Sequence, residues 1–320
     1  MPLNVTQQFP ATRVLLPRTR LAYVHLRNLL TDAKRDRSAR VSGYVIVWLP
    51  EETLILYLRQ GELVNATSRR TGGPYQALPL RHALELVPTE PEYGEICFHE
   101  ADVDQLACMY TAQTTASARW PSSFAFSDPA VLFPYLMSMT FDGFLEITAG
   151  DRVNYLVFKD GAVSRPYLSG NGGSGADRLA RLFGDAPSGE LTVARWGDAA
   201  LPTQAPPALV DAYRELALSL VQRLRDGGST SALAIAEHAR EDLIATHPVL
   251  EGLPLPGHVP RDMVADAAAT TAGVAAWMAQ VLWTVVDCDL KPEALLRDLT
   301  WERRHLFQSA GLYERLPWKL

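Results

Sequence analysis

The sequence predicts an α+β protein made of two small tandem units, each an antiparallel sheet with helices, followed by an all-α C-terminal domain. Its first two thirds repeat at an offset of about one hundred residues, and the pattern after residue 207 is helical. The strongest matches are Gly43 with Gly143, Leu56 with Leu156, Gly61 with Gly161, Gly72 with Gly172 and Gly73 with Gly173. We therefore expect repeats over residues 11–112 and 126–198 and a helical domain over 207–320.

Both repeats have the same predicted order of elements, which is helix, three strands, helix and strand. In the first repeat we expect helices over 21–30 and 75–87 and strands over 43–49, 54–59, 63–66 and 94–98. In the second repeat we expect helices over 131–139 and 175–183 and strands over 143–148, 153–159, 163–165 and 189–193. Gly43, Gly61, Gly143 and Gly161 mark the structural turns of the repeat, because glycine readily takes the positive φ of a tight turn.

Composition and charge narrow the class of protein. Hydrophobic residues make up 48% of the 320 residues and charged residues 21%, which is typical of a globular chain. A net charge of −6 gives no general attraction to nucleic acid or anionic lipid. Cys97, Cys108 and Cys288 lack C-x-x-C spacing, and residues 1–10 lack a basic region followed by an apolar run, so we expect a cytoplasmic protein.

Four blocks of the second repeat resemble the PATAN domain, the N-terminal domain of the cyanobacterial PatA regulators. They are Gly143–Ile147, Tyr155–Val163, Gly175–Ala180 and Gly189–Val193. The resemblance covers about residues 128–197, and the first repeat is similar over Leu56–Ala66 but lacks the glycine at the start of its second helix. It implies a non-catalytic interaction domain of bacterial signalling proteins, often joined to receiver domains. It therefore implies a signalling adaptor of a two-component system with a response regulator as partner, although this chain has two copies and no recognisable receiver domain.

A glycine-rich segment, Gly170–Gly175, offers an alternative function. It fits the pattern G-x-G-x-x-G and leads into a predicted helix, an arrangement in which backbone amides and a helix N-terminus bind phosphate. That fingerprint belongs to a parallel β-α-β unit, whereas the preceding strands are predicted to form an antiparallel meander. We therefore expect a connection between strand and helix, and keep a nucleotide- or phosphate-binding regulator or enzyme as the alternative.

Basic residues are concentrated in the N-terminal region. A candidate anion patch consists of Arg18, Arg20, Arg35, Arg37 and Arg40. Such a patch would bind nucleic acid or an anionic surface. Runs of charge are usually a solvated helix face or loop, and this is the interpretation we favour.

Cys97 and His99 lie on one face of a predicted strand, and Glu100, Asp102 and Asp104 follow. These residue types are metal ligands, but zinc sites usually have two spaced ligand pairs and no second pair is visible. We therefore interpret the segment as a half-buried strand that runs into an acidic, solvated turn. The sequence contains no metalloprotease, Walker or nucleophile-elbow motif, which favours a non-catalytic protein without a cofactor.

The C-terminal third is predicted to form a helical bundle after a proline-rich linker over 201–207. Helices are expected over 207–226, 231–246 and 260–286, and from residue 292. Residues 267–286 carry no charge and could span a bilayer, but their alanine, threonine, glycine and glutamine content favours a buried core helix.

Aromatic residues near the C-terminus are candidate interaction residues. They are Trp301, Phe307, Tyr313 and Trp318. Aromatic side chains anchor many interfaces, although burial in the core explains them equally well. We expect a protein partner rather than nucleic acid or a membrane, and the sequence leaves self-association open.

Overall fold

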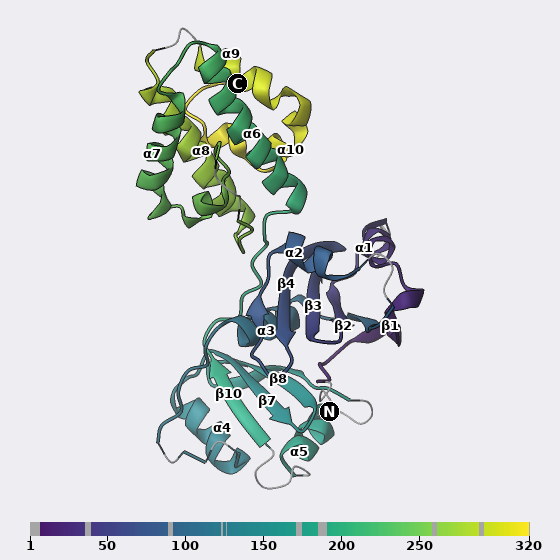
Figure 1. The fold of residues 1–320 in the computed structure, drawn as a ribbon. Coiled ribbons are helices and arrows are strands. Elements are labelled where there is room, and N and C mark those ends of the chain that lie inside the picture. Colours follow the sequence, from purple (N-terminus) through teal and green to yellow (C-terminus); the bar gives the residue numbers. More distant parts are fainter. Residues whose placement is uncertain are drawn as a thin grey trace. The chain divides into compact units, whose positions relative to one another are not determined.

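The computed structural model describes residues 7–35, 40–88, 92–122, 124–125, 127–170, 175–184, 191–257, 261–287 and 291–319. The chain divides into two compact units. The tandem-repeat unit comprises Met1–Ala77 and Leu86–Leu201, and the helical unit comprises Leu78–Glu85 and Pro202–Leu320. The first unit combines antiparallel sheets with helices and the second is mainly helical, which confirms the predicted α+β class (Figure 1).

The two repeats share four equivalent strands: these have the order β6-β2-β3-β4 within the six-stranded sheet of the first repeat, and β10-β7-β8-β9 in the four-stranded sheet of the second. The strands are β2 (Gly43–Trp48), β3 (Glu52–Arg59), β4 (Glu62–Arg70), β6 (Glu95–Glu100), β7 (Gly143–Ala149), β8 (Arg152–Lys159), β9 (Ala162–Tyr167) and β10 (Leu191–Trp196). Gly43 lies opposite Leu58, and Gly143 lies opposite Phe158. An irregularity in register also falls at the same point of the β3–β4 and β8–β9 pairs. These equivalences confirm the predicted duplication.

Gly61 and Gly161 occupy the tight turn after the second strand of each hairpin, with φ of 78° and 76°. A Cβ on Gly61 would lie 2.3 Å from the carbonyl oxygen of Ala33 in α1 (Leu26–Arg35). A Cβ on Gly161 would lie 2.6 Å from the Cα of Met137 in α4 (Pro129–Ser138). Each turn therefore needs glycine both for its backbone conformation and for the close approach of a helix.

Gly43 and Gly143 begin strands β2 and β7 and so lie beside the turns rather than in them. A Cβ on Gly43 would lie 2.1 Å from the carbonyl oxygen of His99, and one on Gly143 would lie 2.2 Å from that of Trp196. Both glycines are thus explained by close packing against the neighbouring strand.

The first helix of the first repeat begins later than predicted. Arg13–Arg20 forms strand β1, which pairs antiparallel with β6, and a 3-10 turn at Leu21–Tyr23 follows before α1 begins. The predicted helix over 21–30 is therefore wrong before residue 26, because the chain instead covers the open edge of β6. Pro17 is tolerated in β1 because a strand at the edge of a sheet need not donate at every position.

The second helix of the first repeat also begins later than predicted. β5 (Gln76–Ala77) pairs with β4, and α2 (Leu80–Leu86) begins only after Pro79. The prediction over 75–87 is therefore wrong before residue 80, since the residue before a proline disfavours helical backbone. Residues 78–85 belong to the helical unit, although the sequence placed them in the first repeat.

Helix α3 (Val103–Thr114) joins the two repeats and was not expected from the sequence. The Asp102 carboxylate caps it by accepting a hydrogen bond from the Asp104 amide at 2.9 Å. Asp102 and Asp104 are exposed, as the predicted solvated turn requires, but they form the start of a helix that was not predicted. The helix contacts β2 and β4 of one sheet and β7 and β8 of the other, and lies between them (Figure 1). Leu106 and Met109 pack with buried residues of both sheets in one shared core.

The second sheet buries its other face under α4 and α5 (Gly175–Gly184). Leu132 and Leu136 of α4 pack there against Leu156 and Phe158 of β8. The helices predicted over 131–139 and 175–183 are confirmed to within a few residues.

The helical unit contains one apolar core. Besides α2, its helices are α6 (Pro207–Asp226), α7 (Ala232–Ile244), α8 (Ala267–Thr284), α9 (Pro292–Thr300), α10 (Arg304–Ser309) and α11 (Leu312–Arg315), with 3-10 turns at Pro248–Gly252 and Trp301–Arg303. The predicted helices are confirmed with two corrections. α8 begins at residue 267 instead of 260, where Asp266 caps the amides of Ala268 and Ala269, and the last helix is interrupted after Thr300.

Helix α8 is the central helix of this core. Trp277 is fully buried, and its indole nitrogen donates to the carbonyl oxygen of Ala236 at 3.0 Å. Residues from Thr270 to Leu282 are mostly buried, which confirms the prediction of a core helix. Within the described residues, we find no helix with the length and apolar character needed to cross a bilayer.

Candidate functional site

The segment that precedes β1 runs between the two repeats and lines two cavities. The Gln8 amide donates to the carbonyl oxygen of Asp151, and the Val153 amide donates to that of Gln8. Phe9 is buried in the shared core. The Tyr44 hydroxyl donates to the carbonyl oxygen of Pro10 at 2.9 Å, which fixes the segment to the first sheet. Both cavities are lined by this segment.

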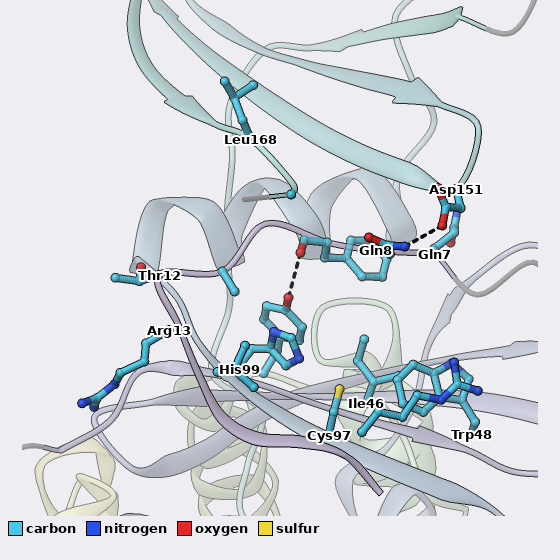
Figure 2. Close-up of a pocket in the computed structure, with 16 residues that line it drawn as sticks. Gln7, Gln8, Thr12, Arg13, Ile46, Trp48, Cys97, His99, Asp151 and Leu168 are labelled. Atoms are coloured by element: carbon cyan, nitrogen blue, oxygen red, sulfur yellow. Dashed lines mark hydrogen bonds between the residues drawn. The ribbon is translucent and has the colours of Figure 1, made fainter. Parts of the chain in front are cut away.

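The larger cavity has a volume of about 750 Å³, within the range of small-molecule sites. Figure 2 shows Ile46, Trp48 and Cys97 on one side of it and Asp151 and Leu168 on the other. The first three come from β2 and β6, so the cavity lies over the part of the first sheet nearest to β1. Its walls are mixed in polarity.

The cationic residues of the larger cavity are paired with carboxylates of β6. Arg13 donates to Glu100 at 2.9 Å, and Arg18 donates to Glu95 at 2.7 Å. The Arg18 guanidinium also lies 4.5 Å from the centre of the Trp48 ring. Because both charges are compensated within the sheet, the cavity does not present two free cations to an anion.

The other members of the predicted anion patch are dispersed along the chain. Arg20 ends β1 and is exposed, and Arg40 is exposed ahead of β2. Arg35 is the last residue of α1 and its side chain is outside the described part of the structure, as is the whole of Arg37. The anion patch therefore stays a prediction.

Cys97 and His99 both line the larger cavity. Burial raises the pKa of the Cys97 thiol to about 12 and lowers the pKa of His99. The His99 ring stacks on Tyr44 with centroids 5.2 Å apart, and in the second repeat Trp196 stacks in the same way on Phe144. The histidine therefore fills the place of a stacking aromatic ring. Among the described residues, no three histidine, cysteine or acidic side chains gather as a metal site.

The glycine-rich segment begins at the rim of the larger cavity. Gly170 lines the cavity with a φ of 89°, and α5 begins at Gly175. Residues 171–174 lie outside the described part of the structure. A phosphate-binding role for the segment stays a prediction.

The smaller cavity, of about 300 Å³, contains polar groups that sequence analysis missed. The Glu146 carboxylate accepts a hydrogen bond from the Tyr155 hydroxyl at 2.9 Å, and burial raises the pKa of Glu146. The side-chain oxygen of Gln113 accepts hydrogen bonds from Tyr57 and Thr67, both at 2.6 Å. Alignment of the repeats would have found Glu146, because its counterpart is Ile46.

A third hollow, the α8 groove, lies on the helical unit and has a volume of about 640 Å³. Its floor is a row of alanines on α8, at positions 272, 275, 276 and 279. Trp283 lies at the end of the row, and residues 315–317 form a wall. The Trp283 side chain is 64% exposed and lies 5.8 Å from the ring of Trp318.

The predicted aromatic interaction residues divide between surface and core. Trp301 is 64% exposed in the 3-10 turn after α9, and Trp318 is half-buried against Trp283. Phe307 is buried and stacks on Tyr213 at 5.5 Å, and Tyr313 is half-buried against the same core. Of these four, Trp301 is mainly exposed, Tyr313 and Trp318 are half-buried, and Phe307 belongs to the core.

No protein-family model matches the chain, and comparison with curated proteins and with solved structures gives no match. The resemblance to the PATAN domain therefore rests on the sequence blocks alone.

Proposed function

We propose that the chain is a non-catalytic cytoplasmic signalling adaptor whose helical unit binds a protein partner in the α8 groove. The observation that carries this proposal is the exposed side chain of Trp283 at the end of that groove. Tryptophan offers a large apolar surface that a partner would remove from water. It is also the residue type most enriched at the energetic centres of interfaces.

The shape of the groove favours a helix as the bound element. The alanines of its floor are spaced along one face of α8, and small side chains let a second helix approach closely. Trp283 and Pro317 would flank the bound helix. An amphipathic helix in an apolar groove is a common mode of recognition.

The charge of the groove favours an acidic residue on the partner. Arg315 lines the groove, and no ion pair among the described residues includes it. A carboxylate on the partner would pair with Arg315 at the rim, which contributes mainly to association rate and specificity. Following the PATAN resemblance, we take the partner to be a receiver-domain protein.

Trp301 provides a matched control for Trp283, because both side chains are 64% exposed and Trp301 lies outside the groove. The full chain, Trp283→Ala and Trp301→Ala would be used to retain proteins from the native host. The retained receiver-domain protein would then be titrated in pure form by calorimetry. We expect Trp283→Ala to weaken binding at least about tenfold and Trp301→Ala to leave it unchanged. Equal binding by both variants would refute the α8 groove as the binding surface. A retained partner without a receiver domain would refute the proposed class of partner.

A further inference from the structure

The inner faces of the two repeats carry different chemistry at one equivalent cross-strand pair. In the first repeat Ile46 of β2 lies opposite Ile55 of β3, and both are buried. In the second repeat Glu146 of β7 lies opposite Tyr155 of β8. An aliphatic pair therefore fits this place in the fold, so the fold does not itself require a carboxyl group there.

Glu146 lacks a cationic partner among the described residues. Its carboxylate accepts a hydrogen bond from Tyr155, which offsets only part of the cost of removing it from water. The ionisable groups whose pKa values are coupled to that of Glu146 are Tyr155, Tyr75 and Cys108. None of them supplies a positive charge. A carboxylate largely removed from water is unfavourable unless a cation pairs with it.

Gln113 forms part of the wall of the same cavity. Its side-chain oxygen is fixed by Tyr57 and Thr67, which orients the amide. Its side-chain nitrogen is buried and has no hydrogen-bond partner among the described residues. Because that nitrogen has almost no accessible surface, a ligand in the cavity would not reach it, and Gln113 contributes to the wall rather than to a contact.

The lining of the cavity determines the charge and size of the ligand. It is formed by Gln7, Phe9, Pro74, Tyr75, Ala112, Gln113, Thr114, Thr115, Glu146 and Val153. These residues include an acidic side chain but no lysine or arginine, which favours a cation over an anion. The volume of about 300 Å³ suits a small molecule, and Phe9, Ala112 and Val153 offer it apolar surface.

We propose that this cavity binds a small primary amine with its ammonium group on the Glu146 carboxylate. An ammonium group donates up to three hydrogen bonds, and its pairing with a carboxylate is among the stronger polar contacts in proteins. This binding site is separate from the α8 groove and does not depend on the adaptor proposal.

Leucinamide is a suitable probe, because it combines a primary amine with an apolar side chain and carries no carboxylate that Glu146 would repel. The full chain would be titrated with leucinamide by calorimetry. N-acetyl-leucinamide would be the control without a charge, and acetate the control without an amine. We expect leucinamide to bind with a Kd below ~1 mM and N-acetyl-leucinamide to bind at least about tenfold more weakly. Absence of leucinamide binding at this level, or preferential binding of acetate, would overturn the proposal.

Variants test the role of Glu146. Glu146→Gln should weaken leucinamide binding at least about tenfold, since it removes the charge and keeps the shape. Asp160→Asn, which removes a carboxylate outside the cavity, should leave binding unchanged. The double variant Glu146→Ile with Tyr155→Ile copies the pair of the first repeat and should remain folded by circular dichroism while losing binding. Undiminished binding by Glu146→Gln or by the folded double variant would show that the carboxylate is not part of a ligand site.

Discussion

Alanine at Gly161 is expected to destabilise the tandem-repeat unit more than alanine at Gly150. Both glycines have positive φ, 76° and 62°, so each substitution carries the cost of left-handed backbone, about 1–2 kcal/mol. A Cβ on Gly161 would also lie 2.6 Å from Met137 Cα and 2.9 Å from the carbonyl oxygen of Leu136, whereas nothing lies within 4 Å of one on Gly150. Moving α4 away adds about 1–3 kcal/mol. We therefore expect a loss of roughly 2–5 kcal/mol at Gly161.

Hydrogen exchange measured on peptides from β7 and β8 is the appropriate assay, because a chain with two compact units need not unfold in one step. Gly161→Ala should exchange between about 5- and 150-fold faster than Gly150→Ala, as the added 1–3 kcal/mol predicts. Equal exchange rates in the two variants would refute the close packing of α4 against this turn. Faster exchange in Gly150→Ala would refute it as well.

Two further predictions concern Glu146 and the aromatic residues of the helical unit. The pKa of Glu146 is raised in the folded state. Its contribution to the free energy of unfolding is therefore greatest at pH values below the usual glutamate pKa, and it is lost as the pH rises through the raised pKa. Glu146→Gln should abolish this loss of stability when melting temperatures are measured between about pH 4 and pH 8. The same pH dependence of the melting temperature in the variant and the unchanged protein would contradict this prediction. Phe307→Ala should cost about 3–5 kcal/mol in urea unfolding, because the ring is buried on Tyr213. Trp301→Ala, at an exposed position, should change the free energy of unfolding by no more than about 0.5 kcal/mol. A larger loss in Trp301→Ala than in Phe307→Ala would contradict the assignment of Phe307 to the core and Trp301 to the surface.

The duplicated hairpins could be predicted because their signals are local. Strands β2 and β3 are apolar and β-branched, and the turn at Gln60 and Gly61 takes positive φ at both residues. The second repeat has the same turn at Asp160 and Gly161. Each signal lies within a few residues of the structure that it specifies, so no distant contact is needed to interpret it.

Helix α3 could not be predicted because it is buried on most sides. Seven consecutive residues from Gln105 to Thr111 are buried between two sheets, so the helix lacks the polar face that gives a surface helix its periodicity. Strand β1 was missed for another reason. Its partner β6 lies about eighty residues away in the sequence, and Pro17, judged from the local sequence alone, argues against a strand.

The polar site was missed because alternation along a strand does not show what covers each face. Phe144 and Glu146 lie on the same face of β7, and a glutamate in such a pattern is usually solvated. The face is instead covered by α3 and by the segment that contains Phe9. Because this cover comes from elements outside the hairpin, the environment of Glu146 follows only from the tertiary structure.

Comparison of the two repeats separates what the shared fold requires from what one copy adds. Histidine is chemically more reactive than glutamate, yet the counterpart of His99 in the second repeat, Trp196, stacks on an aromatic ring with the same geometry. Stacking therefore accounts for the presence of an aromatic ring at His99. Glu146 has Ile46 as its counterpart, and no feature common to both repeats accounts for a carboxylate. An unfavourable group that appears in one copy, on a face where the other copy is apolar, must be stabilised by something specific to that copy. A ligand is therefore expected in the smaller cavity rather than in the larger one.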